Sequence, residues 1–179
     1  CSLLDQLPNY PWLIKHNPKE LEQSLFKQLL WQSTSFAREV KVANCDILFN
    51  TSAITLCRFE PMVVLSQTMI SYEPGVMQYY GYGLIRFRFL VIHVIQNLAF
   101  RRANGVIFLS QYASEMIQKS CGTLSRVVNI PHGVNKVFNK KYPAIDWPDQ
   151  KNRSVRCVYV SNADMYKHQW VVVNAISLL

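Results

Sequence analysis

The segment ANGVIFLSQYASEMIQKSCG, residues 103–122, has the pattern of a buried strand that leads directly into a helix. Residues 106–109 are all apolar, which is typical of strands covered on both faces in parallel sheets. Ser110 follows at the position of a helix N-cap, and Gly122 stands where the C-terminus of a helix favours glycine. The segment therefore predicts one strand–helix unit, with the helix at residues 111–121.

Short apolar runs that end near polar or turn residues recur along the rest of the chain. They are found at residues 46–49, 62–65, 127–130 and 155–160. Between the runs at 62–65 and 106–109, residues 84–102 are long enough for a crossover helix that joins parallel strands. The alternation of strands and helices predicts an α/β fold with a Rossmann-like parallel sheet.

Two further features of the predicted helices bear on packing. Residues 19–42 have a helical period that gathers four leucines on one face: Leu21, Leu25, Leu29 and Leu30. In the helix at 84–102, residues 89–95 are apolar all round, which predicts burial and makes His93 a hydrogen-bonded core residue. Arginines flank this centre at Arg86, Arg88, Arg101 and Arg102. These arginines could contact anionic lipid head groups. The alternative is that they are solvated at the two ends of a buried helix.

Composition narrows the class of protein. With 179 residues, 50% of them hydrophobic, the chain can bury the core of one domain and part of another. Its net charge of +8 predicts an anionic partner, such as nucleic acid, a lipid surface or a phosphorylated small molecule. Five widely spaced cysteines without a CxxC pair argue against a disulfide framework and a structural zinc site, and favour a reducing cytoplasm.

The organisation of the chain changes after residue 138. Residues 140–153, KKYPAIDWPDQKNR, contain two prolines, many charges and little periodicity, so we interpret 139–154 as an interdomain linker or hinge. The alternative is a long surface loop within one domain. The interpretation divides the chain into a domain at 1–138, the linker, and the start of a second domain at 155–179. Because the chain begins at Cys1 and ends within a helical pattern, we expect a fragment cut at both ends.

The last segment, VRCVYVSNADMYKHQWVVVNAISLL at residues 155–179, combines a strand-like run, a polar loop, a lysine and a helix-like run. The loop carries Ser161 and Asn162, and Lys167 opens the helical pattern. A helix N-terminus with a nearby lysine stabilises an anionic ligand, so the segment predicts a diphosphate site. The alternative is an ordinary strand-to-helix turn with a solvated lysine.

Three blocks of sequence resemble a known family. They are residues 103–117 (ANGVIFLSQYASEMI), 127–138 (VVNIPHGVNKVF) and 159–176 (YVSNADMYKHQWVVVNAI). In order and spacing they resemble the last strand and helix of the N-terminal domain, the hinge segment and the start of the nucleotide-binding domain of family 4 glycosyltransferases. Residues 44–53 and 61–74 are more weakly similar to bacterial surface-polysaccharide members of this family. The resemblance implies the GT-B architecture, two Rossmann-like domains facing each other across a cleft.

The resemblance also implies a function. Such enzymes transfer a sugar, here expected to be a hexose, from a UDP- or GDP-linked donor to a glycan or lipid-linked acceptor, with retention and without a metal. Ser161, Asn162 and Lys167 would bind the donor diphosphate, although Asn162 stands where the family usually has arginine and cannot supply that residue's charge. The family's glutamates for the nucleoside and sugar would lie beyond Leu179, so we expect the fragment alone to be inactive and its catalytic residues stay unknown. The implied location is cytoplasmic, with peripheral contact at the inner face of the membrane.

The remaining site residues are assigned to the acceptor side and to the hinge. Four polar or flexible residues follow the strand at 62–65, where α/β sheets place ligands, and are expected at the acceptor: Gln67, Thr68, Met69 and Glu73. Loop capping without ligand contact is the alternative. Ser110, His132 and Gly133 are expected at the hinge and cleft, where Gly133 would permit a positive φ.

Two other functions stay open on the sequence. A non-catalytic nucleotide- or phosphate-binding α/β module would explain Asn162 in place of arginine. A nucleic-acid-binding domain would explain the positive charge, but the cations are scattered and no basic–aromatic motif is present, so we expect no nucleic acid partner.

Overall fold

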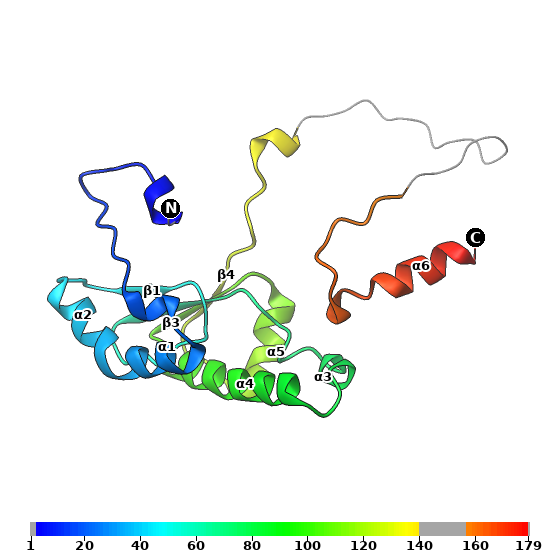
Figure 1. Cartoon of the computed structure of the whole chain (residues 1–179), viewed down its shortest axis with the longest axis horizontal. Helices are drawn as coiled ribbons and strands as arrows, with labels where there is room; N and C mark the ends of the chain where they lie inside the picture. The colour runs from blue at the N-terminus through cyan, green and yellow to red at the C-terminus, as the bar shows by residue number, and fades with distance from the viewer. Residues whose placement is uncertain (1–2, 140–156, 179) are drawn as a thin grey trace.

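Four short strands form one parallel sheet in the computed structural model, which describes residues 3–139 and 157–178 (Figure 1). They are β1 (Leu48–Asn50), β2 (Met62–Ser66), β3 (Gly105–Phe108) and β4 (Val127–Asn129). Each strand pairs in parallel with the next strand along the chain. The structure therefore confirms the parallel α/β sheet and places four of the five predicted strands within two residues of their expected positions.

One face of the sheet is buried under two long helices. The helices are α4 (Leu84–Arg102), which packs on β2, and α5 (Gln111–Cys121), which packs on β3 and β4. Along β2 burial alternates, so that Met62, Val64 and Ser66 point into the core. A connection between two parallel strands of one sheet is almost always right-handed. Because β2, β3 and β4 follow one another in a single direction across the sheet, the helices that connect them lie on the same face. Figure 1 shows both helices below the strands.

The opposite face of the sheet is less well covered. On this face the register places Phe49 beside Val63 and Leu65 beside Ile107, and Ile107 in turn lies beside Val128. Val63, Leu65 and Ile107 are half-buried, while Phe49 and Val128 are about half exposed, at 53% and 48%. The core of the domain therefore lies almost entirely between the sheet and the two helices.

Helix α5 begins and ends as its sequence predicts. The Ser110 hydroxyl accepts a hydrogen bond from the backbone N–H of Ala113 at 3.1 Å, which satisfies one free donor of the first turn. Gly122 ends the helix with φ +87°, a conformation that L side chains rarely adopt. These caps confirm the strand–helix unit at residues 103–122.

The N-terminal region differs from the single helix predicted at residues 19–42. It consists of a 3₁₀ turn η2 (Lys19–Glu22), α1 (Leu25–Trp31), a π-turn η3 (Gln32–Phe36) and α2 (Ala37–Val42). Backbone at Gln23 and Ser24 is extended, and the π-turn adds a residue to the helical period. The extended break separates Leu21 from the leucines of α1, and the π-turn changes the register only after them. The predicted leucine face is wrong: Leu21, Leu25 and Leu30 are exposed, and Trp31 and Val40 are buried instead.

The remaining elements are short. They are the 3₁₀ turns η1 (Leu3–Gln6), η4 (Lys136–Asn139) and η5 (Met165–Lys167), and the helices α3 (Val76–Tyr79) and α6 (Gln169–Ser177). The longest described helix is α4, and none in the described ranges is long and apolar enough to cross a membrane.

The strand predicted at residues 155–160 is wrong for the part that the structure describes. Residues 157–160 form no strand, and Val158 and Val160 are 84% and 91% exposed. A strand needs a neighbour to complete its backbone hydrogen bonds, and no described strand lies beside this segment. Residues 155 and 156, and all of the predicted linker except Asn139, lie outside the described residues.

Four of the five cysteines fall within the described part, and all four are free thiols. Cys57 and Cys121 are buried, and this burial raises the pKa of both thiols. A raised pKa keeps a thiol protonated and unreactive, so these two residues behave as small apolar core residues.

Candidate functional site

A pocket of about 300 Å³ lies between the loop after β2 and the C-terminal segment. Its lining residues come from two parts of the chain that are far apart in sequence: Met69, Ile70, Glu73 and Val76 on one side, Tyr166 and His168 on the other. Its volume is at the lower end of the range for small-molecule sites. The loop follows the carboxyl end of β2, which is where open α/β sheets bind ligands.

Hydrogen bonds fix the loop side of the pocket. The backbone N–H groups of Tyr72 and Glu73 both donate to the carbonyl of Met69, at 2.8 and 2.9 Å. The ring of His93 on α4 makes a hydrogen bond at each nitrogen, to the Ser71 carbonyl at 2.9 Å and to the Ser120 hydroxyl at 2.8 Å. This confirms His93 as a hydrogen-bonded packing residue, half-buried rather than fully enclosed, that holds the loop in place.

The carboxylate of Glu73 is held from α5. The Tyr112 hydroxyl donates to Glu73 Oε1 at 2.9 Å, and this hydrogen bond raises the pKa of Tyr112. A carboxylate has room for several hydrogen bonds, so Glu73 keeps acceptor capacity for a ligand hydroxyl. The pocket thus combines an apolar floor of Met69, Ile70 and Val76 with one oriented acid.

Aromatic contacts hold the C-terminal segment against α3. The Tyr79 ring lies 5.2 Å from His168 and 5.9 Å from Trp170, both edge-on, and these two rings are 5.1 Å apart. Tyr80 donates a hydrogen bond to Asp164 Oδ1 at 2.9 Å, across 84 residues of sequence. We call Tyr79, His168 and Trp170 the aromatic clasp.

The Tyr80–Asp164 contact depends on a neutral phenol. Desolvation, followed by the hydrogen bond to Asp164, raises the pKa of Tyr80 from its usual 10 to about 12. Because the docked form holds the proton more tightly, its contribution is complete below pH 10 and is lost as the pH rises through 12. At neutral pH the phenol is therefore protonated and able to donate this hydrogen bond.

Replacing Tyr79 by alanine is expected to release the segment from α3. The change removes two aromatic pairs, each worth about 0.5–1.5 kcal/mol. Amide hydrogen exchange in residues 165–178 should therefore accelerate about fivefold or more, while exchange in β2 and β3 stays unchanged. Tyr82→Ala is the matched control, because Tyr82 is 96% exposed and lies outside the clasp. Equal exchange in the two variants would show that the clasp does not hold the segment.

The predicted diphosphate residues share one loop, but it differs from the expected geometry. Lys167 ends the 3₁₀ turn η5, and α6 begins two residues later at Gln169. The residue between them, His168, has the left-handed φ of +54°, which is unusual for a residue with a side chain. The expectation that Lys167 opens the helix is therefore wrong by two residues, and it lies just before the helix N-terminus.

The loop is closed on itself by Gln169. The Gln169 side-chain amide donates to Ser161 Oγ at 2.8 Å and to the Asn162 carbonyl at 2.7 Å. Ser161 in turn donates to the carbonyl of Asn162 at 2.9 Å. Sequence reasoning missed Gln169, and only its position at the start of an apolar helix could have suggested a capping role.

The amine of Lys167 has no carboxylate partner among the described residues. Its Nζ lies 4.8 Å from the centre of the Tyr166 ring, a cation–π distance. Its carbonyl accepts a hydrogen bond from Tyr159 at 3.0 Å, which fixes the backbone at this turn. Lys167 is half-buried and sits in sequence between Tyr166 and His168, which both line the pocket. An anion at this position would meet an uncompensated positive charge.

The structure divides the predicted acceptor residues into two groups. Met69 and Glu73 line the pocket, whereas Gln67 and Thr68 are exposed and do not. The side chains of Gln67 and Thr68 make no hydrogen bond with any residue that the structure describes. The alternative that these two residues cap the loop by local hydrogen bonds therefore does not explain their presence.

Just before them, Ser66 has a buried hydroxyl without a partner among the described residues. Ser66 is 4% exposed and ends β2. An unsatisfied buried polar group costs about 1–3 kcal/mol, so Ser66→Ala is expected to leave stability unchanged or to raise it by about 1 kcal/mol. Urea unfolding measures this, with Ser114→Ala as the control, because Ser114 is equally buried but its hydroxyl accepts a hydrogen bond from Gln118. A loss of stability in Ser66→Ala would mean that the hydroxyl has a partner.

The predicted hinge residues do not reach the pocket. Ser110 caps α5, while His132 and Gly133 lie in an exposed segment between β4 and η4. Gly133 does not have the positive φ that was expected of it. Because its φ lies outside the left-handed region, glycine is not required there for conformational reasons.

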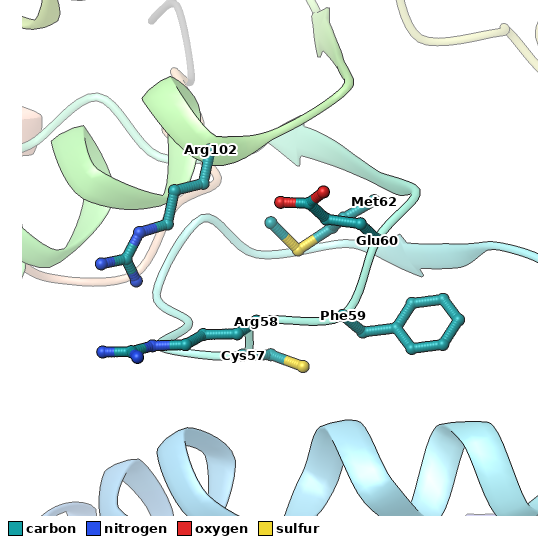
Figure 2. A pocket seen from close by; sticks show the side chains of 6 residues that line it. All are labelled: Cys57, Arg58, Phe59, Glu60, Met62 and Arg102. Carbon is teal, nitrogen blue, oxygen red and sulfur yellow. The ribbon is translucent and has the colours of Figure 1, made fainter.

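A second cavity lies at the opposite end of β2 (Figure 2). It has a volume of about 310 Å³, and Figure 2 shows the side chains of Arg58 and Arg102 extending toward the same side, with Glu60 above Arg58 and beside Arg102. Met62, the first residue of β2, forms part of its wall. Because it lies at the amino end of the strand, it is not where a parallel α/β sheet usually binds its ligand.

Comparison with models of protein families, with curated proteins and with solved structures finds no match to this chain. The described residues also contain no group of three His, Cys, Asp or Glu side chains that could hold a metal ion. The features of this chain that bear on function are the pocket and the loop at residues 161–169.

Proposed function

We propose that this chain forms the acceptor-side domain and the start of the donor-side domain of a nucleotide-sugar-dependent glycosyltransferase with GT-B architecture. In this proposal the enzyme transfers a hexose from a UDP- or GDP-linked donor to a glycan or lipid-linked acceptor, with retention, at the cytoplasmic face of a membrane. Its products serve cell-surface polysaccharide synthesis. The proposal rests on sequence resemblance and on the site, because α/β folds of this kind host many functions.

One observation supports the proposal most directly. The pocket joins the loop after β2, where an acceptor is expected, to the segment that carries Lys167, where a donor diphosphate is expected. Glu73 and His168 face this pocket from its two sides. A transferase must hold two substrates with their reacting atoms close together, and a site built from two separate segments suits that need.

The chemistry assigned to Lys167 is electrostatic. As the bond from the sugar to the diphosphate breaks, negative charge grows on the leaving group, and a fixed positive charge nearby stabilises the transition state. Lys167 has no described carboxylate to neutralise it and lies just before the N-terminus of α6. Both features favour a dianionic ligand at this loop.

A non-catalytic nucleotide- or phosphate-binding module is the second candidate. It is favoured by the internal hydrogen bonds of Ser161 with Asn162 and Gln169, because groups already paired within the loop are less available to a diphosphate. Asn162 also offers an amide where the resembling family has a guanidinium, which weakens the grip on two phosphates.

Donor turnover by the full-length protein tests the proposal. Release of nucleoside diphosphate is measured with UDP- and GDP-linked sugars, alongside binding of UDP and GDP by calorimetry. The transferase proposal predicts binding of one nucleotide and turnover of the matching donor. Binding without turnover, in the presence of a range of glycan and lipid-linked acceptors, would favour the non-catalytic module. No binding of either nucleotide would contradict the transferase proposal and, for UDP and GDP, nucleotide binding by a non-catalytic module.

A further inference from the structure

The outer side of α4 is an apolar surface that no described element covers. Five residues at helical spacing make up this surface, which we call the α4 stripe: Leu84, Phe87, Leu90, Val91 and Val94. Their exposed fractions are 87%, 65%, 52%, 38% and 57%. Figure 1 shows α4 along the lower edge of the body, away from the uncovered face of the sheet.

This exposure corrects the expectation that residues 89–95 are buried all round. Only Ile95 of that group is fully buried, together with Gln96, Ala99 and Phe100 in the second half of the helix. The sheet against which α4 packs has short strands and covers only one side of the helix. A helix that is apolar on every side but packed on only one leaves a hydrophobic surface that needs a partner.

The charged side chains of α4 are all positive. Arg88, Arg101 and Arg102 are exposed, and α4 contains no aspartate or glutamate anywhere in its 19 residues. Before the helix, Tyr82 is 96% exposed, and the guanidinium carbon of Arg86 lies 4.6 Å from the centre of its ring. No described carboxylate forms an ion pair with any of these arginines. The surface thus combines apolar, aromatic and cationic groups, and α4 itself adds no acidic one.

We propose that the α4 stripe docks on an anionic lipid bilayer, with α4 lying in the plane of the interface. Leu84, Phe87 and Val94 would enter the boundary between head groups and acyl chains. Arg86 and Arg88 would contact the phosphates, and Tyr82 would lie at the depth that aromatic side chains prefer. Two of the four arginines that flank the centre of this helix, Arg86 and Arg88, would thereby be partners of head groups.

Charge complementarity favours an anionic lipid surface, and not a second copy of this chain, as the partner of the α4 stripe. A symmetric dimer through the α4 stripe would bring the same arginines of both copies together, with no acidic residue of α4 to pair with them. Like charges in one interface oppose association. An anionic bilayer instead supplies the opposite charge and an apolar layer at the same depth.

Vesicle sedimentation tests the proposal with the full chain and no nucleotide. Large vesicles of phosphatidylcholine alone are compared with vesicles that also contain about 30% phosphatidylglycerol. The second kind carries the negative surface charge that attracts lysine and arginine. Wild type is expected to bind the anionic vesicles and to be released by raised salt. The double variant Phe87→Ser, Val94→Ser should bind at least tenfold more weakly, since the apolar contact is lost. Arg88→Glu should weaken binding by more than about fivefold, the effect of one cation near the surface.

Phe26→Ser is the matched control, because Phe26 on α1 is 76% exposed and lies outside the α4 stripe. Its binding should equal that of wild type. The proposal is overturned if wild type does not bind anionic vesicles, or if Phe26→Ser weakens binding as much as the double variant. It is also overturned if sedimentation velocity finds a dimer that the double variant dissolves. Because no nucleotide is present, failure here leaves the test of donor turnover unaffected.

Discussion

Lys167→Ala is expected to reduce donor turnover by the full-length protein about a hundredfold or more, which is the usual effect of removing one preorganised group from a developing anion. The physical reason is the isolation of the Lys167 amine. It faces the Tyr166 ring at 4.8 Å and has no described carboxylate partner, so its charge is available to a diphosphate. Steady-state release of nucleoside diphosphate, at donor concentrations above and below KM, measures the effect.

The separate effects of Lys167→Ala on kcat and on KM distinguish two roles for the lysine. A fall in kcat would mean that the lysine stabilises the transition state, whereas a rise in KM alone would mean uniform binding of the donor. Lys167→Arg keeps the charge and should retain more activity than Lys167→Ala. Lys119→Ala is the control, because Lys119 is exposed on α5, away from the loop. If Lys167→Ala and Lys119→Ala have the same turnover, the diphosphate assignment is wrong.

Phe108→Ala is expected to lower the free energy of unfolding by about 3–5 kcal/mol. Phe108 is fully buried at the end of β3, and its ring lies 5.8 Å from that of Phe100 on α4. Truncation leaves a cavity between the sheet and the helix in addition to the lost burial of the ring. Because a domain of this kind is stable by only about 5–15 kcal/mol, the variant should lose much of its stability.

Urea unfolding followed by circular dichroism measures this change. Phe26→Ala provides the comparison, because it removes the same ring from a site that is 76% exposed. It should change stability by no more than about 0.5 kcal/mol. Similar losses in both variants would show that the interface between the sheet and α4 is not the core of the domain.

The central part of the fold could be predicted from the sequence because its signals are local. Strands β2 and β3 are short apolar runs, and α5 carries a serine cap and a terminal glycine within the same segment. Each signal depends on neighbours a few residues away, so no knowledge of tertiary contacts was needed.

The failures arise where structure depends on distant partners. The extended break at Gln23 and the π-turn η3 change which side of the N-terminal helices is buried, and propensity does not reveal them. The apolar run before Ser161 is strand-like, but a strand forms only beside another strand.

The candidate site was predicted in part for the same reason. Met69, Glu73 and Lys167 were identified from their place after a strand or before a helix. Tyr79, Tyr80 and His168 were missed, because their importance comes from contacts that join α3 to a segment more than 80 residues further along the chain. Only the positions of aromatic residues beside Lys167 hinted at them.

The order of the strands has a consequence for how the protein is made. Since β1, β2, β3 and β4 lie side by side in the order in which they are synthesised, each new strand finds its partner already formed. The segment at 157–178 is synthesised after all four strands and contacts α3. Substitutions in that segment should therefore spare the yield of folded protein, so activities of its variants can be compared at equal concentrations of native sheet.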